Sequence, residues 1–336
     1  MTDISAKQDT NGANGMGGYQ PPSAEEIILY AKDPATKIAT ITFNRPDHLN
    51  APTADARLRY ADLLHRAEID DDVKVVVIRG VGSNLGSGAD IPEAMAMSMD
   101  PSAEGWLREL RVDDASAVNF PPIGSFRHGS AITQWYANAA AGCRSLQEFK
   151  KISIVEAKGY CYGWHFYQAA DADLVISSDD TLFGHPAFRY IGFGPRMWTW
   201  AQTMGIRRFQ EMVFTGRPFT AQEMYDCGFA NKVVTRDQLE AEVDKYAQAC
   251  ARNRPTDTIF MQKIFFEMMK QNQGEYMGSM LTALFEAVGN HAKPDASELT
   301  LDEDTLSAGI NNAVKDFDEG FPPDFRLSKS ARRRPE

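Results

Sequence analysis

Two glycine-containing segments carry the residue types that could do chemistry in this chain. The first is the run Gly-Ser-Gly-Ala-Asp at 86–90, and the second is Lys-Gly-Tyr-Cys-Tyr-Gly-Trp at 158–164. Glycine lets a turn aim backbone N–H groups into a cavity, and the first N–H groups of a helix have no partner within that helix. Two such N–H groups from different segments could stabilise negative charge on the carbonyl oxygen of a thioester.

Three polar side chains follow these segments and could transfer protons. His165 and Tyr167 come directly after the second segment, and His185 follows Gly184. Histidine titrates near neutral pH and can act as acid or base, whereas tyrosine can donate a hydrogen bond or a proton. An isolated residue of either type is more often a hydrogen-bonded part of a pocket wall, so both interpretations stay open at this point.

Two other glycine-based sites are disfavoured. Gly80 and Gly82 follow a β-branched run, as in a dinucleotide-binding fold, but Leu85 stands where the third glycine of that fingerprint is needed. A P-loop is excluded because the chain has no Gly-Lys-Ser/Thr triplet.

The elements that must hold the two segments follow from the periodicity of apolar residues. Alternation at 38–43 predicts a half-buried strand, and the β-branched run at 73–78 predicts a buried one. Short apolar runs at 152–156 and 174–177 predict two more strands, and helical spacing predicts a helix over 54–67. Strands alternating with helices in this order indicate an α/β fold.

The C-terminal part of the chain is expected to be mostly helical. Thr220 and Glu223 have the spacing of a capping box, which predicts a helix beginning near Ala221. The Met- and Phe-rich stretch at 260–269 is typical of a packing surface. We expect a disordered leader at 1–23, because Gly, Asn, Gln and Ser dominate it, then a core at 24–235 and a helical region for contacts between copies, with a tail, at 236–336.

Composition limits the class of protein. The 336 residues are 43% hydrophobic, enough for a well-buried core, and the formal net charge of −11 argues against a nucleic-acid binder. No apolar stretch is long enough to span a bilayer, and the N-terminus does not read as a secretory signal. The four cysteines show neither metal-ligand spacing nor a disulfide framework, so we expect a cytoplasmic protein with reduced cysteines and no metal site.

Six motifs, in order and spacing, resemble the crotonase (enoyl-CoA hydratase/isomerase) superfamily. They extend over about residues 27–239 and are Asn44-Arg45-Pro46 with Leu49-Asn50-Ala51, the run Asp72 to Gly80, Gly88-Ala89-Asp90, Ile154 to Gly159, Asp171 to Ile176, and Thr215 to Val234.

The resemblance implies a crotonase-like spiral of repeated ββα units with an extended helical C-terminal region. It also implies a homotrimer or dimer of trimers, and an acyl-CoA substrate that brings its own coenzyme A, with no separate cofactor. By position, the oxyanion N–H groups fall on Ser87 and Trp164, with substrate-binding neighbours at Gly88, Ala89, Asp90 and Gly163.

The chain departs from the family at both glutamates that a standard hydratase uses. Tyr167 and Ala187 stand at the matching positions, so neither usual carboxylate can activate water or protonate the α-carbon. The candidates for proton transfer are therefore Tyr167, His185 and His165. Three hypotheses remain: a hydratase/isomerase-like enzyme acting through an enolate or oxyanion, a hydrolase of a C–C bond or thioester in which His185 activates water, and a non-catalytic CoA-binding homologue.

Overall fold

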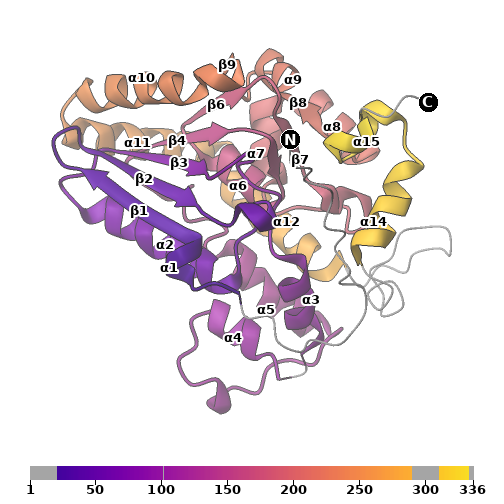
Figure 1. The fold of residues 1–336 in the computed structure, drawn as a ribbon. Helices are drawn as coiled ribbons and strands as arrows, with labels where there is room; N and C mark the ends of the chain where they lie inside the picture. Colours follow the sequence, from indigo (N-terminus) through magenta and orange to yellow (C-terminus); the bar gives the residue numbers. More distant parts are fainter. Residues whose placement is uncertain (1–20, 101, 290–309, 333–336) are drawn as a thin grey trace, which may run out of the picture. The chain divides into compact units, whose positions relative to one another are not determined.

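The computed structural model describes residues 21–100, 102–289 and 310–332 (Figure 1). The chain divides into two units, of which Pro22–Ala292 is the larger. The described part of the other unit contains helices α14 (Ile310–Glu319) and α15 (Lys329–Arg332). Nearly all of the leader expected at 1–23 lies outside the described residues.

A six-stranded sheet forms the centre of the larger unit. Its first two strands pair antiparallel and all other neighbours are parallel. In spatial order the strands are β1 (Ile28–Asp33), β2 (Ile38–Phe43), β3 (Val75–Gly80), β4 (Ile152–Ala157), β6 (Leu174–Ser178) and β9 (Lys232–Val234). The four predicted strands are thus confirmed, with the second displaced by two residues.

Helices cover both faces of this sheet, as Figure 1 shows for α2 (Ala54–Ile69) below it and α10 (Leu239–Arg252) above it. Because side chains alternate along a strand, neighbouring residues of β3 reach different cores. Val76 packs in the cluster that contains Tyr60 of α2, whereas Val77 packs with Val243 of α10. Burying each such aliphatic side chain contributes about 1.5–3 kcal/mol.

A smaller sheet carries the second glycine segment. It consists of β5 (Tyr160–Tyr162), β7 (Leu182–Gly184) and β8 (Phe219–Thr220). Strands β5 and β7 are parallel, so their carboxyl ends lie side by side. One strand therefore leads into helix α6 (Trp164–Asp171), and its neighbour leads directly to His185.

Three further helices pack together, the second contacting both the first and the third. They are α4 (Glu104–Glu109), α5 (Phe126–Ala137) and α12 (Glu275–Gly289). A buried ion pair joins Arg57 to Glu109 at 2.5 Å, and the indole of Trp135 donates to the same carboxylate at 2.7 Å. Glycines let α12 approach its neighbours, since a Cβ on Gly129 would lie 2.6 Å from Val288 Cγ1.

Two of the remaining helices agree with the predictions from the sequence. Helix α9 (Ala221–Asp226) begins with the predicted capping box between Thr220 and Glu223. Helix α11 (Thr256–Asn272) carries the Met- and Phe-rich stretch. Helices α10, α11 and α12 lie in the larger unit together with the strands. The expected boundary near residue 235, between a core and a helical region for contacts between copies, stays a prediction.

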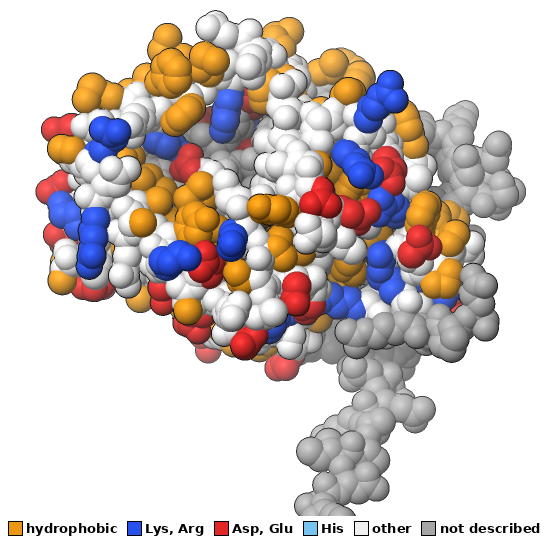
Figure 2. All heavy atoms as spheres, turned by 90° about the horizontal axis from the view of Figure 1, so that it is seen from above, with side chains coloured by type: hydrophobic (Ala, Val, Ile, Leu, Met, Phe, Trp, Pro, Cys, Tyr) orange, Lys and Arg blue, Asp and Glu red, His pale blue; other side chains and the backbone are white. Residues whose placement is uncertain are grey.

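On the face seen in Figure 2, basic, acidic and hydrophobic side chains are interspersed, and neither sign of charge dominates. None of the helices in the described ranges is both long and apolar enough to cross a membrane.

Candidate active site

The two glycine segments touch through their backbones. Gly88 has φ +111° and Gly163 has φ +54°, values that favour glycine. A Cβ on Gly163 would lie 3.1 Å from the Cα of Gly88, and one on Gly88 would lie 3.6 Å from the nitrogen of Trp164. A side chain on Gly163 would crowd Gly88, and the positive φ at both positions disfavours other residues, so the glycines favour this contact.

Backbone hydrogen bonds fix the first segment against the smaller sheet. The Gly86 N–H donates to the Tyr160 carbonyl at 2.8 Å, and the Tyr162 N–H donates to the Gly86 carbonyl at 3.0 Å. At the far edge of β5, the Gly163 N–H donates to the Gly184 carbonyl at 3.0 Å. The first glycine segment, the start of α6 and the residue after β7 are thereby brought to one place.

Most backbone N–H groups of the first segment donate a hydrogen bond to a protein acceptor. Ser87 donates to the Leu49 carbonyl at 2.9 Å, Gly88 to Nδ1 of His165 at 3.2 Å, and Asp90 to the Pro52 carbonyl at 3.4 Å. The expectation that the Ser87 N–H group is an oxyanion donor is therefore wrong, because this N–H already has a protein acceptor. Within residues 21–100, 102–289 and 310–332, the N–H group of Ala89 has none.

The N–H group of Trp164 is the counterpart in the second segment. Trp164 is the first residue of α6, where the backbone N–H has no intrahelical acceptor, and no other acceptor occurs in the described ranges. Trp164 also lies at the positive end of the helix dipole. Ala89 and Trp164 thus present two unpartnered amide donors on backbones that touch.

Asp90 holds the first segment in place through its carboxylate. Its carboxylate accepts from Nη1 of Arg45 at 2.6 Å and caps helix α3 (Ile91–Met99) by accepting from the Glu93 N–H at 3.1 Å. Arg45 also donates to the Ala51 carbonyl at 2.9 Å. The Asn-Arg-Pro and Gly-Ala-Asp motifs are therefore joined by one ion pair.

His165 is fully buried behind the contact between the glycines. Its Nδ1 lone pair is occupied by the Gly88 N–H, and its ring lies edge-on to Phe43 with centroids 4.7 Å apart. A Cβ on Gly86 would lie 2.1 Å from Cε1 of this imidazole, so the ring occupies the space above that glycine. Burial lowers the pKa of His165 to about 3. His165 is therefore neutral and packs under the loop, with its Nδ1 lone pair taken by Gly88; its role in proton transfer stays a prediction.

His185 and Tyr167 do meet. The Tyr167 hydroxyl lies 3.5 Å from Nε2 of His185, and the same Nε2 lies 3.1 Å from the Phe193 carbonyl. Because a carbonyl only accepts, we assign the proton to Nε2, which leaves Nδ1 as a buried acceptor with no partner among the described residues. Burial, opposed by the bond to Phe193, lowers the pKa of His185 to about 4.

Tyr167 is buried in the same surroundings. Burial, together with the nearby Glu286 carboxylate, raises the pKa of its hydroxyl well above the ordinary value. The hydroxyl therefore stays protonated and can donate a hydrogen bond. Ala187, at the second missing glutamate position, is buried in the short helix after His185 and supplies no polar group.

Sequence reasoning missed Glu286 on α12. This carboxyl group is buried, forms a hydrogen bond with Tyr136 of α5, and has a pKa that burial raises to about 8. Its charge also raises the pKa of Tyr167 and Tyr190. A lone glutamate on a helix has no spacing signal, so only packing reveals it.

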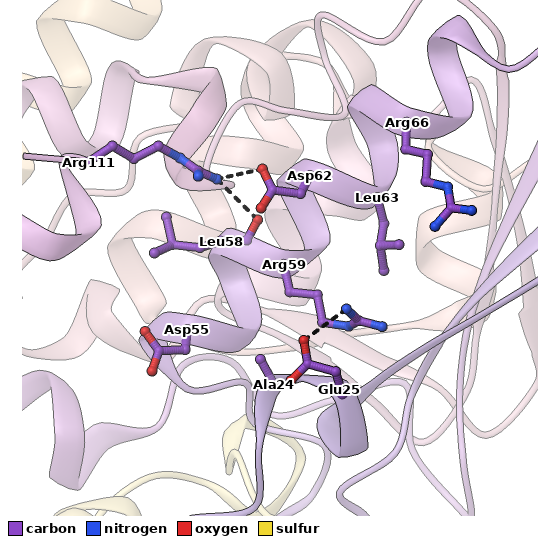
Figure 3. Close-up of a pocket in the computed structure, with 9 residues that line it drawn as sticks. All are labelled: Ala24, Glu25, Asp55, Leu58, Arg59, Asp62, Leu63, Arg66 and Arg111. Carbon is purple, nitrogen blue, oxygen red and sulfur yellow. Dashed lines mark hydrogen bonds and ion pairs between the residues drawn. The ribbon is translucent and has the colours of Figure 1, made fainter. Parts of the chain in front are cut away.

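A surface depression of about 420 Å³ lies elsewhere, between α2 and the start of the larger unit (Figure 3). Its charges pair with one another: Arg59 contacts Glu25 at 3.1 Å and Arg111 contacts Asp62 at 2.8 Å. It includes none of the predicted site residues. In the described ranges, no group of three or more His, Cys, Asp and Glu side chains is arranged to hold a metal ion.

Comparison with known proteins gives a consistent result. The model of the enoyl-CoA hydratase/isomerase family matches residues 33–117 and 128–300. The mevalonyl-coenzyme A hydratase sidH of Aspergillus fumigatus is 26% identical over 227 residues, which cover 66% of this chain and 72% of that protein. The 4-chlorobenzoyl coenzyme A dehalogenase-2 of an Arthrobacter species is 26% identical over 217 residues, covering 64% and 69%.

Solved structures show the same architecture. An enoyl-CoA hydratase from Mycobacterium smegmatis matches with a TM-score of 0.70 and 24% identity, over 89% of this chain and 96% of that one. This likeness concerns the fold alone, and it confirms the predicted crotonase-like α/β class.

The buried histidines generate a prediction about stability. Their folded pKa values lie below the roughly 6.5 of an unfolded histidine, so the unfolded chain binds more protons below that pH. The free energy of unfolding should therefore fall as the pH drops from about 7 towards 4, by about 1.4 kcal/mol per pH unit for each such histidine. His165→Asn, which keeps an acceptor for Gly88, should make this pH dependence shallower in urea unfolding experiments.

The exposed His65 provides the control. His65→Gln should leave the pH dependence as in the unmodified protein. An unchanged slope in His165→Asn would show that this imidazole is not held neutral by the fold.

Proposed function

The chain belongs to the enoyl-CoA hydratase/isomerase family, and on that premise we propose that it converts an acyl-coenzyme A thioester whose carbonyl oxygen gains negative charge during the reaction. One observation carries the proposal: among the described residues, the N–H groups of Ala89 and Trp164 have no protein acceptor, and they lie on touching backbones. The two relatives described above are both named for coenzyme A thioesters, which supports the same substrate class. The coenzyme A then belongs to the substrate, and the chemistry requires no further cofactor.

The two amides suit either of two intermediates. Removal of an α-proton produces an enolate, and attack on the carbonyl produces a tetrahedral oxyanion; both concentrate charge on the thioester oxygen. Fixed N–H donors stabilise that charge without rearranging, and losing one such donor typically costs about 10²–10³ in rate. Gly88 and Gly163 serve this chemistry by letting the donors converge.

His185 and Tyr167 are proposed to act beside the oxyanion. The unpartnered Nδ1 of His185 can accept a proton or a hydrogen bond from water, and the Tyr167 hydroxyl can orient the water or the substrate. A water activated in this way would make the enzyme a hydrolase, which is the second candidate function. It is favoured by the absence of a carboxylate at positions 167 and 187, where an ordinary hydratase needs two.

A homotrimer or dimer of trimers is proposed as the assembly. Helices α11 and α12 expose large apolar side chains that a partner subunit would cover, among them Met261, Phe265, Met268 and Met277 at 62%, 56%, 61% and 73% exposure. Contiguous exposed apolar surface of this kind usually marks an interface.

The substrate proposal predicts binding of acyl-CoA esters. Calorimetry with acetyl-, butyryl-, crotonyl- and benzoyl-CoA should detect binding of at least one ester, with free coenzyme A weaker. Infrared difference spectra with a ¹³C-labelled thioester should show the bound carbonyl stretch at lower frequency, because two N–H donors polarise it. Failure of the whole panel to bind would exclude the proposed substrate class, and product mass would separate hydration from hydrolysis.

The proton-transfer proposal predicts the effect of two substitutions. His185→Ala and Tyr167→Phe should each lower turnover of the active ester by about 10²-fold or more, with binding retained because the oxyanion donors are backbone groups. The matched control is His65→Gln at the surface. Normal turnover in both folded variants would remove these side chains from the chemistry.

The assembly proposal predicts a trimer or hexamer at micromolar concentration in light scattering. Phe265→Glu combined with Met268→Glu should shift the mass towards the monomer, because charge cannot be buried unpaired in an apolar interface. Phe214→Glu, at an isolated exposed site on α8 (Ile206–Thr215), should leave the mass unchanged. A monomer in the unmodified protein would contradict the assembly.

A further inference from the structure

We infer that Glu286 is the carboxyl group that transfers protons at this site, supplied by helix α12 in place of the glutamates absent from positions 167 and 187. The inference rests on the proposed function, because the group needs an acyl-CoA substrate to act on. It concerns a residue outside both glycine segments and outside every motif that defines the family resemblance.

The first support is an unsatisfied carboxyl oxygen. Glu286 is 5% exposed, and its Oε2 has no hydrogen-bond partner in the part of the chain that the structure describes. Buried polar atoms are nearly always paired, so an unpaired one needs an explanation. The carboxyl group forms a hydrogen bond with the Tyr136 side chain, and we take the unpaired Oε2 as the atom that a substrate would meet.

The second support is where α12 places this carboxyl group. The preceding residue, Phe285, packs on Phe193 with ring centroids 5.1 Å apart. The carbonyl of Phe193 is the group that binds Nε2 of His185 at 3.1 Å. One turn earlier, the Thr282 hydroxyl donates to the Pro195 carbonyl at 3.4 Å. The same short segment therefore contacts both α12 and His185.

The start of α12 is tied to another part of the chain by a buried ion pair. Glu275 lies 3.5 Å from Nη2 of Arg144, and both side chains are buried. Within the helix, Glu275 also accepts from the Ser279 hydroxyl at 2.5 Å. Because breaking a buried ion pair is costly, this contact helps to hold the helix that carries Glu286.

The surroundings of Glu286 are neutral. The titratable groups that interact with it are Tyr136 on α5, Tyr167 on α6, and Tyr190 and Cys143 on the intervening segments. Burial raises the pKa of Glu286 to about 8, which the bond from Tyr136 partly opposes. The carboxyl group is therefore mostly protonated at pH 7, as suits a general acid.

The proposed proton transfer needs no reagent besides the substrate and Glu286. Glu286 gives its proton to the α-carbon of the enolate: the carboxyl O–H bond breaks and the enolate electron pair forms the new C–H bond. The thioester carbonyl re-forms, so its oxygen loses the negative charge that the two N–H groups stabilised. Glu286 becomes a carboxylate. In reverse, the carboxylate takes the α-proton and the electron pair moves to the thioester oxygen.

Hydrogen exchange tests this step directly. Butyryl-CoA and acetyl-CoA, incubated with the full-length protein in D₂O, should gain α-deuterium that mass spectrometry detects. Glu286→Gln keeps the side-chain volume and should slow the exchange by about 10²-fold or more, with ester binding by calorimetry unchanged. Glu240→Gln, an exposed carboxylate on α10, is the matched control and should exchange at the normal rate.

A second measurement, the pH dependence of exchange in the unmodified protein and in Glu286→Asp, covers the case in which Glu286→Gln does not fold. The exchange rate should change with pH through a group titrating near 8, and Glu286→Asp should move that inflection. Exchange at the normal rate in folded Glu286→Gln, or no inflection between about pH 7 and 9, overturns the role of Glu286. An absence of exchange with esters that bind overturns it too, while leaving the substrate class intact; an absence of binding defeats the substrate class itself.

Discussion

The contact between the backbones of Gly88 and Gly163 is the constraint on which the rest of the site depends. It brings the segments that carry the N–H groups of Ala89 and Trp164 into backbone contact, and a Cβ on Gly163 would lie only 3.1 Å from the Cα of Gly88. Neighbouring strands help to hold this contact in place. Hydrogen bonds from Gly86 to β5 and from Gly163 to β7 supply the support, and His165 fills the space behind the loop.

Burial then decides the charge of every group around that contact. His165, His185, Tyr167 and Glu286 are all removed from water, and each therefore favours its uncharged form. Elsewhere in the interior, Arg57 pairs with Glu109 and Arg45 with Asp90. Among the described residues, no protein acceptor pairs with the N–H groups of Ala89 and Trp164.

The sequence predicts those parts of the molecule that depend on neighbours along the chain. The strand at 38–43, the helix over 54–67 and the capping box at Thr220 all have local signals, and the structure contains each of them. Ser87 was misassigned because its N–H pairs with the carbonyl of Leu49, which belongs to another part of the chain. Glu286 could not be found at all, because its burial depends on how α12 packs against α5.

Tyr167 and Glu286 also constrain each other. A glutamate at position 167 would place a second carboxyl group in the apolar surroundings that already raise the pKa of Glu286. Two carboxylates in one buried space cannot both ionise without a large cost, since nearby like charges disfavour the charged form. A tyrosine hydroxyl avoids that repulsion and can still donate a hydrogen bond to a carboxylate or to a substrate oxygen. A tyrosine at position 167 of α6 is therefore physically compatible with a buried glutamate on α12. Two glutamates in this space would compete for one proton.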